Sequence, residues 1–448
     1  MKPNARFFPA MLVVAAAVLF PAGNVSAAGW KVLYSFQGGN DGAVPAGGVV
    51  FDKQGNLYGA TSDGGSGCTA GSCGTVFQLV PPANKGGKWS ENVLHNFQGQ
   101  DGSIPEGGVI LDGAGNVYGT TAYGGSGPCT LFGSTVGCGV VYEMVAPKTK
   151  NGAWTEKVLY NFLGNKDGQF PIGDLVFDKA GNLYGATQFG GGYGSCDSPF
   201  YQHCGTIFKL SPPKTKGGKW KEKVLYSFKS GKDGANPNGG LIFDNKGAIY
   251  GTTGSGGDQV CKGAGYVGCG TAYKLIPQLT EGGRWREKIL HIFVNYHKDG
   301  AGPNGGLVFD TNGRLYGTTT GGGSTQNGVA FQLAKSAGGW TVNVVRTFLD
   351  GRDSMAGLIF DSLGNLYGNT NGGGFDGVGT VFKLKGPGAG GGQWHLDLLH
   401  AFTGPPDGAF PAAKLIFDKA GSLYGTTQAG GNGQACQSGC GTVFETLP

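Results

Sequence analysis

Residues 241–253 read Leu-Ile-Phe-Asp-Asn-Lys-Gly-Ala-Ile-Tyr-Gly-Thr-Thr, two apolar or aromatic stretches on either side of a short polar turn. Asp244 and Gly247 stand at the first and fourth positions of that turn, as a type I turn prefers. The segment therefore predicts a tight antiparallel hairpin. It excludes a parallel β-helix, in which each strand stacks on the next coil and does not fold back after four residues.

The hairpin belongs to a unit that occurs seven times. A segment of the form x-Tyr-Gly-x-Thr, with Leu, Val or Ile before the tyrosine, recurs every 51 to 66 residues, and one tryptophan precedes each copy. The seven tyrosines are Tyr58, Tyr118, Tyr184, Tyr250, Tyr316, Tyr367 and Tyr424. In the fourth unit, strand signals cover residues 220–228, 241–244, 249–253 and 270–275. Four antiparallel strands per unit at this period are typical of a propeller blade, so the sequence predicts an all-β, seven-bladed β-propeller over residues 28–448.

The order of strands also predicts how the ring closes. Leu241, Ile242 and Phe243 are apolar on both strand faces, as a strand near the axis requires, because neighbouring blades cover both sides of its sheet. We therefore expect this strand to be innermost and the tryptophan-containing strand to be outermost. The chain starts with an outer strand, residues 30–36, and finishes with a third strand, residues 441–447. Pairing the two would complete the last blade and remove an exposed sheet edge.

At this point the repeat resembles a known family. The motifs Val-Leu-Tyr-Ser-Phe, Asp-Gly-x-x-Pro-x-Gly-Gly-Leu-Ile-Phe-Asp, Gly-Asn-Leu-Tyr-Gly-Thr-Thr and Gly-Thr-Val-Phe-Lys-Leu look like the GloVer (Gloeo/Verruco) tandem repeat. The resemblance covers the whole mature chain and implies an exported bacterial protein. Some members carry a C-terminal surface anchor, whereas this sequence stops at Pro448, just past the last repeat. The family has no settled activity, so the resemblance strengthens the fold more than the function.

The first residues predict export. Lys2 and Arg6 precede an apolar run over residues 7–20, and Val-Ser-Ala at 25–27 offers a cleavage point. We interpret residues 1–27 as a signal peptide, since the apolar run is short for an uncleaved membrane anchor. The mature chain is expected in the periplasm, at the cell surface or outside the cell, as a monomer without a membrane span. Its net charge falls from +5 to about +3 without Lys2 and Arg6, which gives no reason to expect nucleic acid.

All ten cysteines fall in one kind of loop, between the Tyr-Gly strand and the Gly-Thr-Val-Phe strand. An even number in an exported chain indicates disulfides, and pairing within each loop is the economical connectivity. Zinc binding by thiolates is the alternative, but most gaps are longer than zinc ligands usually have. The predicted pairs are Cys68 with Cys73, Cys129 with Cys138, Cys196 with Cys204, Cys261 with Cys269, and Cys436 with Cys440.

No catalytic motif stands out in the sequence. A Gly-x-Ser-x-Gly elbow, a zinc-protease helix motif and a phosphate-binding Gly-Lys-Ser are all absent. His95, His291 and His400 occupy a strand position that other repeats fill with tyrosine, and only His203 and His297 fall in variable loops. We expect no cofactor. Structural Ca²⁺ is the alternative, held by a ring of loop carboxylates around the channel mouth. These carboxylates would be Asp41, Asp101, Asp167, Asp233, Asp299 and Asp407.

Asymmetry between repeats indicates where a ligand would bind. The loops of repeats two to four carry aromatic residues that are costly to expose without a partner, or that fold down as local cores. They are Tyr123, Phe132, Phe189, Tyr193, Phe200, Tyr201 and Tyr266. The first hypothesis is a non-enzymatic module that binds a glycan, an envelope polymer or a protein on this loop face. The rivals are a polysaccharide lyase or glycosidase at the central mouth, for which Asp174 and Lys414 are hints, and a purely structural surface protein.

Overall fold

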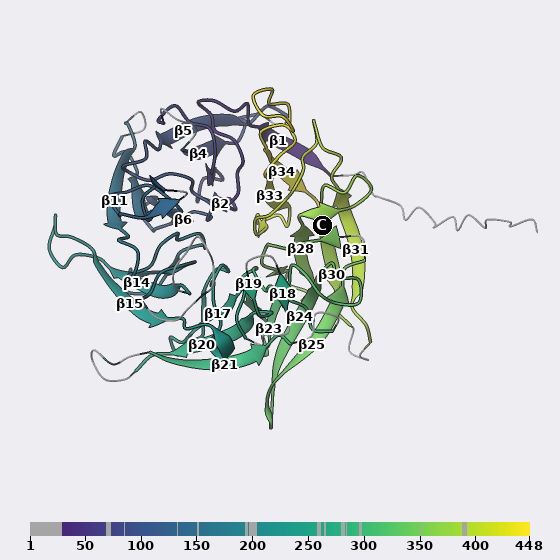
Figure 1. Cartoon of the computed structure of the whole chain (residues 1–448). Coiled ribbons are helices and arrows are strands. Elements are labelled where there is room, and N and C mark those ends of the chain that lie inside the picture. The colour runs from purple at the N-terminus through teal and green to yellow at the C-terminus, as the bar shows by residue number, and fades with distance from the viewer. Residues whose placement is uncertain are drawn as a thin grey trace, which may run out of the picture.

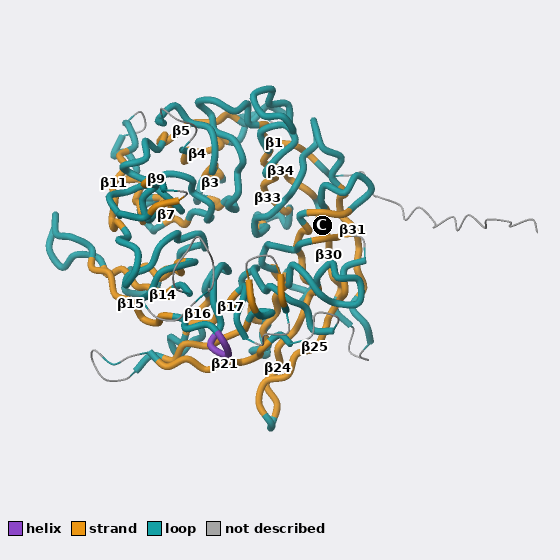
Figure 2. Tube along the Cα trace, viewed as in Figure 1, coloured by secondary structure: helices purple, strands orange, loops and turns teal. Residues whose placement is uncertain are grey.

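The computed structural model describes residues 29–448 except 69–72, 85, 132, 150–151, 193–195, 197–203, 258–260, 264–265, 279–282, 284, 295–297, 350 and 388–391. Seven four-stranded antiparallel sheets surround a central axis (Figure 1). The prediction of a seven-bladed propeller is confirmed. Strands and their connecting loops account for almost all of the described chain (Figure 2), and no described helix is long and apolar enough to cross a membrane.

Each blade runs from an inner strand at the axis to an outer strand at the rim. Blade 1 holds β2 (Val50–Phe51), β3 (Leu57–Thr61), β4 (Thr75–Val80) and β5 (Ser90–Asn96). Blade 2 holds β6 (Ile110–Leu111), β7 (Val117–Thr121), β10 (Val140–Val145) and β11 (Thr155–Asn161). Blade 3 holds β12 (Val176–Phe177), β13 (Leu183–Thr187), β14 (Thr206–Ser211) and β15 (Lys221–Ser227). Blade 4 holds β16 (Ile242–Phe243), β17 (Ile249–Thr253), β20 (Thr271–Ile276) and β21 (Arg286–Ile292).

The remaining blades follow the same order. Blade 5 holds β22 (Val308–Phe309), β23 (Leu315–Thr318), β24 (Val329–Ser336) and β25 (Gly339–Thr347). Blade 6 holds β27 (Ile359–Phe360), β28 (Leu366–Thr370), β30 (Thr380–Lys385) and β31 (His395–Ala401). Blade 7 holds β32 (Ile416–Phe417), β33 (Leu423–Thr427), β34 (Thr442–Thr446) and β1 (Lys31–Ser35). Loops add the small pairs β8 (Thr130–Leu131) with β9 (Ser134–Thr135), β18 (Lys262–Gly263) with β19 (Tyr266–Val267), and β26 (Gly351–Arg352) with β29 (Gly372–Gly373), and one 3-10 turn, η1 (Gly231–Asp233).

The inner hairpin forms as the sequence predicts. Ile242 pairs with Tyr250, and the carboxylate of Asp244 accepts hydrogen bonds from the backbone N–H of Lys246 and Ala248, both at 2.9 Å. Tyr250 Oη donates to the same carboxylate at 3.2 Å. Gly247 closes the turn at φ +80°, where a side chain is disfavoured. The regular inner strand spans only two of the four residues predicted: Leu241 precedes it, and Asp244 belongs to the turn.

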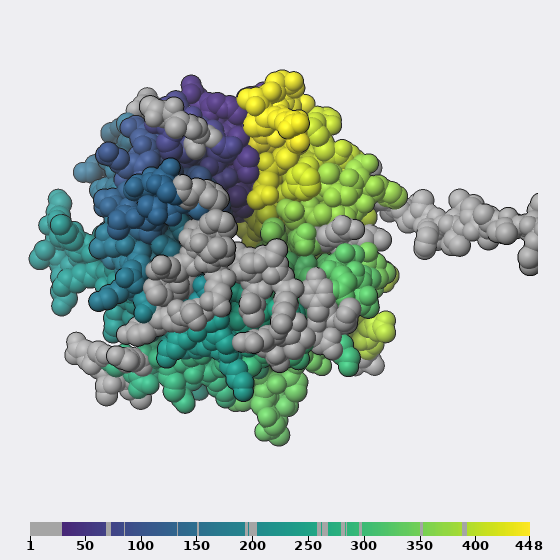
Figure 3. All heavy atoms as spheres, viewed as in Figure 1, coloured from purple at the N-terminus to yellow at the C-terminus, as the bar shows by residue number. Residues whose placement is uncertain are grey.

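Ring closure is also confirmed. β1 pairs antiparallel with β34, with Lys31 opposite Glu445, so the first strand completes the last blade. Thr426 in blade 7 donates to the carbonyl of Gly47 in blade 1 at 3.1 Å. In the space-filling view, the N-terminal and C-terminal segments lie directly against each other (Figure 3).

One aromatic contact recurs at all seven blade junctions. A ring on the third strand of each blade meets, mostly edge to face, a phenylalanine that follows the outer strand of the preceding blade, with centroids 5.1 to 5.5 Å apart. The pairs are Phe36–Phe77, Phe97–Tyr142, Phe162–Phe208, Phe228–Tyr273, Phe293–Phe331, Phe348–Phe382 and Phe402–Phe444. The glycine of each Tyr-Gly segment lies under that ring: a Cβ on Gly59 would come within 2.5 Å of Phe77 Cζ.

The cysteine loops and the Asp-Gly loops share one face of the ring, which we call the loop face. Isolated bridges join the two kinds of loop, for example Ala43 with Asp63 and Ala235 with Ser255. All five predicted disulfides are present, in blades 1, 2, 3, 4 and 7. The loop face is therefore cross-linked in five of its seven blades.

The glycine under the aromatic ring gives a stability prediction. Gly59→Ala forces its new Cβ into Phe77, and overpacking of this kind costs about 1–3 kcal/mol of unfolding free energy. Urea unfolding followed by circular dichroism measures the loss. Gly113→Ala is the matched control, because nothing lies within 4 Å of its Cβ and its φ is ordinary. Equal stability of the two variants would contradict this account of the repeat glycine.

Candidate functional site

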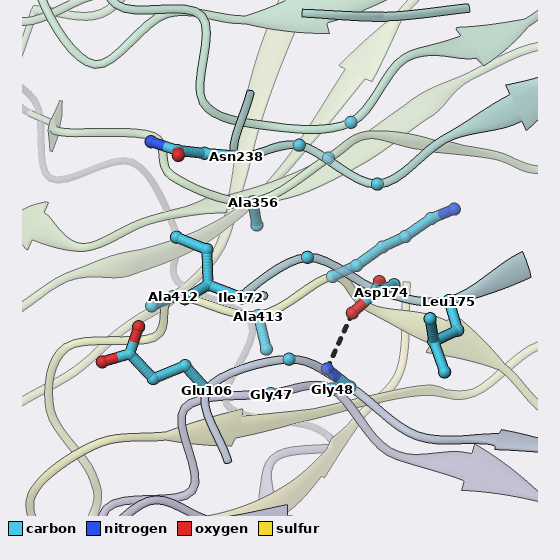
Figure 4. Close-up of a pocket in the computed structure, with 18 of the residues that line it drawn as sticks. Gly47, Gly48, Glu106, Ile172, Asp174, Leu175, Asn238, Ala356, Ala412 and Ala413 are labelled. Atoms are coloured by element: carbon cyan, nitrogen blue, oxygen red, sulfur yellow. Dashed lines mark hydrogen bonds between the residues drawn. The ribbon is translucent and has the colours of Figure 1, made fainter. Parts of the chain in front are cut away.

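A cavity of about 470 Å³ opens where the seven inner strands begin. The residues just before each inner strand line it, so every blade contributes to the wall (Figure 4). Because the Asp-Gly loops lead into these segments, this cavity forms the channel mouth on the loop face.

Glycines allow the blades to converge at this level. The last residue before each inner strand's apolar run is Gly48, Gly108, Gly240, Gly306 or Gly357 in five blades. A Cβ on Gly306 would come within 3.3 Å of the backbone of Gly240 in the adjacent blade. The matching residues in the other two blades are Asp174 in blade 3 and Lys414 in blade 7. These two side chains break the symmetry of the glycine ring, and the structure brings both into one cavity.

Asp174 is held in place by the neighbouring blade. Its Oδ1 accepts a hydrogen bond of 2.7 Å from the backbone N–H of Gly108 (Figure 4). That bond fixes the carboxylate against the wall and leaves Oδ2 to face other groups. Lys414 is exposed.

A second ring of variable residues lies two positions earlier in each blade: Ala46, Glu106, Ile172, Asn238, Asn304, Met355 and Ala412. Asn238 Nδ2 donates to Asn304 Oδ1 at 3.3 Å, while Asn238 Oδ1 is buried and has no hydrogen-bond partner in the described structure. The Glu106 side chain is accessible from the channel but is surrounded by protein on most sides, and this desolvation raises the pKa of Glu106. In Figure 4, Glu106 and Asn238 lie toward one end of the cavity and Asp174 toward the other.

The chemistry available at the mouth is therefore that of carboxyl, amide and ammonium groups. Histidine, cysteine, tyrosine and arginine do not occur among the lining residues. The two carboxyl groups, Glu106 and Asp174, do not point toward each other (Figure 4). The convergence of Asp174, Lys414 and a histidine that an enzyme at this mouth would favour is not seen in the described lining.

The predicted aromatic cluster falls mostly outside the described residues. Phe132, Tyr193, Phe200 and Tyr201 lie there, together with His203 and His297; the backbone of Tyr266 forms part of β19, but its side chain is not among the described ones. Phe189 is 2% exposed, and Tyr123 is half-buried. Both rings contact Phe170, with centroids 6.0 and 4.7 Å away, beside the Cys129–Cys138 disulfide. For these two residues the structure shows a local core over blades 2 and 3.

The Asp-Gly carboxylates lie near the outer strands, at the rim. Tyr34 Oη donates to Asp41 at 3.0 Å, and His95 Nε2 lies 2.8 Å from Asp101. Equivalent contacts join Tyr160 to Asp167, Tyr226 to Asp233, His291 to Asp299 and His400 to Asp407. No group of three or more potential metal-binding side chains occurs within the described ranges. These aspartates therefore connect each linker to its outer strand, and they do not surround the channel mouth as the calcium alternative required.

Sequence reasoning missed one exposed aromatic. Phe375 is 88% exposed at the tip of the loop-face turn of blade 6, where Gly377 N donates to Gly374 O. Leu349 and Met355, in the linker from blade 5 to blade 6, are also exposed. That linker pairs with the Phe375 loop through β26 and β29, and its Met355 end lines the cavity. Comparing blade 6 with blade 5, which has Ser324 at the matching loop position, would have revealed Phe375.

Comparison with known proteins agrees with the fold. A model of the Gloeobacter/Verrucomicrobia repeat matches residues 24–261, 128–348 and 259–448. No curated protein matches the sequence. A fungal alcohol oxidase in complex with copper superposes with a TM-score of 0.55 at 15% identity, over 94% of this chain and 76% of that chain. An ulvan lyase bound to a GlcA–Rha3S saccharide gives a TM-score of 0.52 at 10% identity, over 92% and 95% of the two chains. At these identities the similarity shows the propeller fold alone.

Proposed function

We propose that this chain, which belongs to the Gloeobacter/Verrucomicrobia repeat family, is an exported, non-enzymatic binding propeller. The propeller fold alone does not determine an activity. Its ligand is a glycan or a sugar-containing envelope polymer, held on the loop face with one saccharide unit in the channel mouth. The observation that carries this proposal is the pair Asp174 and Lys414, which interrupts a ring of glycines inside a cavity of ligand size.

The size and lining of the cavity support a small polar ligand. Small-molecule sites usually measure about 300–1,000 Å³ and combine mostly apolar walls with a few polar groups. This cavity of about 470 Å³ has that character. Sugar hydroxyls both donate and accept hydrogen bonds, so they match the carboxylate of Asp174 and the ammonium group of Lys414.

The exposed residues beside the mouth support a longer ligand. The linker from blade 5 to blade 6 runs from the rim to the channel, and it carries Leu349 at one end and Met355 at the other. Phe375 lies next to this linker, and we call the three exposed apolar residues Leu349, Met355 and Phe375 the apolar strip, with Arg352 and Asp353 between its two linker members. An open aromatic ring offers a flat face on which a sugar ring of a polymer can stack.

The rival function is a polysaccharide-acting enzyme with Glu106 as general acid. The raised pKa of Glu106 favours it, because a protonated carboxyl group is what a general acid needs. A glycosidase also needs a second carboxyl group across the scissile bond, and Asp174 is turned toward Gly108. Release of reducing sugar or of unsaturated product from candidate polymers would support this rival.

The mouth can be tested by making blades 3 and 7 like the others. Asp174→Gly combined with Lys414→Gly introduces the residue that five blades already carry, so the fold should be retained. Loss of hydrogen bonds to charged groups should weaken binding about tenfold or more. A microarray of neutral and uronate-containing oligosaccharides identifies the ligand, and calorimetry measures its affinity. Unchanged affinity in a normally folded double variant would rule out the mouth as the site.

The apolar strip has its own test. Phe375→Ala should reduce affinity for a long oligosaccharide by about two- to tenfold, the usual worth of an aromatic contact, with little effect on a monosaccharide. Phe375→Trp should retain the affinity. Leu363→Ala is the control, because Leu363 is equally exposed but lies in the inner-hairpin turn on the opposite face. An equal loss with Leu363→Ala would show that the effect is not specific to the strip.

A further inference from the structure

Four consecutive blade junctions carry the same half-buried acid at the rim. Glu91, Glu156, Glu222 and Glu287 occupy one register position on the outer strands of blades 1 to 4, opposite a third-strand leucine or methionine. The same position holds Val342 in blade 5 and Leu396 in blade 6. In blade 7, Trp30 precedes β1 and stacks on His400 of blade 6 at 3.6 Å. The acids therefore occur only at the junctions of blades 7/1, 1/2, 2/3 and 3/4.

Each glutamate faces the Asp-Gly carboxylate of the preceding blade. At the 3/4 junction, Tyr226 Oη lies 3.1 Å from Glu287 Oε2 and also contacts Asp233, so one hydroxyl bridges the two carboxyl groups. At the 7/1 junction, Tyr34 Oη lies 3.0 Å from Asp41 and 3.5 Å from Glu91. A tyrosine hydroxyl has one proton to donate, and two carboxylates cannot hydrogen bond to each other without another.

The glutamates also carry oxygen atoms without partners. Oε1 of Glu91, Glu156, Glu222 and Glu287 is buried and unpaired within the described structure. A carboxylate with a buried, unpaired oxygen beside a second carboxylate is doubly unfavourable, because it is desolvated and faces a like charge. A neutral carboxylic acid removes the like-charge repulsion and lowers the desolvation cost, because an uncharged group is less costly to bury.

We propose that these four junctions are proton clasps: below neutral pH each glutamate is a neutral acid packed between two blades, and loss of its proton loosens that half of the ring. The half includes the 7/1 junction, where the closing strand β1 meets blade 1. The stability of the propeller is therefore expected to depend on pH through four sites that are distinct from the channel mouth.

The surroundings of each acid agree with this assignment. Burial, followed by the charge of the facing aspartate, raises the pKa of Glu91 and of Glu222 to about 8. Burial raises the pKa of Glu156 to about 7, with His95 opposing the rise, and it also raises the pKa of Glu287, with Lys229 opposing. The titratable and charged groups that face the four acids are Tyr34 and Asp41; His95, Asp101 and Tyr142; Tyr160 and Asp167; and Tyr226, Lys229, Asp233 and Tyr273.

The direction of the pH dependence of stability follows from the linkage between proton binding and folding. The folded protein holds these protons more tightly than the unfolded chain, whose glutamates titrate near 4.3. Their stabilising contribution is complete below that pH and is lost as the pH rises through about 7 to 8, the range given by Glu156, Glu91 and Glu222. Unfolding at pH 7 must therefore release protons.

The experiment compares the purified protein with a variant that cannot lose these protons. The melting temperature of the wild type should fall by several degrees between pH 5.5 and 8.5. In Glu91→Gln/Glu156→Gln/Glu222→Gln/Glu287→Gln the fall should be less than half as large, and the variant should melt higher than the wild type at pH 8.5. Calorimetric unfolding at pH 7 in buffers of different ionisation enthalpy should show release of more than one proton from the wild type.

Single variants allow the test to be made even if the quadruple variant does not fold. Glu222→Gln alone should flatten the pH profile partially, whereas Asp376→Asn, at an exposed loop carboxylate, should leave it unchanged. A variant that melts lower than the wild type at every pH would overturn the proposal, because it would show that the glutamates are ionised and paired. Identical pH profiles would overturn it as well. Glycan binding at pH 5.5 is a separate readout, since no clasp residue lines the mouth.

Discussion

The contact on which the rest of the propeller depends is the aromatic pair between adjacent blades. Phe77 lies over Gly59 in its own blade and meets Phe36 of the preceding blade edge to face, 5.1 Å away. Such pairs stabilise by about 0.5–1.5 kcal/mol beyond the area they bury. Because the same pair occurs at every junction, it sets one spacing and one angle for all seven blades. The recurring glycine, tyrosine and phenylalanine of the repeat follow from that single requirement.

Equal spacing at the core determines what the channel can contain. The seven blades bring their inner segments so close that a Cβ on Gly48 would lie 3.0 Å from the backbone oxygen of Lys414. Most positions at this level must therefore be glycine, and a side chain there occupies the channel itself. Asp174 and Lys414 therefore place a carboxylate and an ammonium group inside the channel, which the same residues on an open surface would not do. Five blades contribute an uncharged glycine at this level, and the charged residues of the other two blades make the site polar and asymmetric.

The fold could be predicted almost completely because its determinants are local or periodic. The turn at Asp244 and Gly247, the apolar inner strand and the cysteine pairs are all readable within one repeat, and comparison between repeats gives the blade count and the closure by β1. The candidate site was harder to predict from the sequence. The union of Asp174, Glu106 and Asn238 in one cavity depends on how far the blades converge, which no single repeat encodes. Burial was harder still: Phe189 and Phe375 are both loop phenylalanines in sequence, yet one lies in a local core and the other is 88% exposed.

The departures from sevenfold symmetry fall in two separate places, and each has its own physical consequence. At the channel mouth the exceptions are charged residues among glycines, in blades 3 and 7, where they meet a cavity open to ligands. At the rim, four blades carry a glutamate (Glu91 and its three equivalents) and three carry the apolar Val342, Leu396 or Trp30, at a position that the preceding blade covers. The aromatic pairs lie between the two levels and contact the rim position: Tyr142 and Tyr273 face Glu156 and Glu287, and Trp30 packs on Phe402 and Phe444. Because no clasp glutamate lines the mouth, such a ring can change its ligand at the mouth without altering its response to pH at the rim.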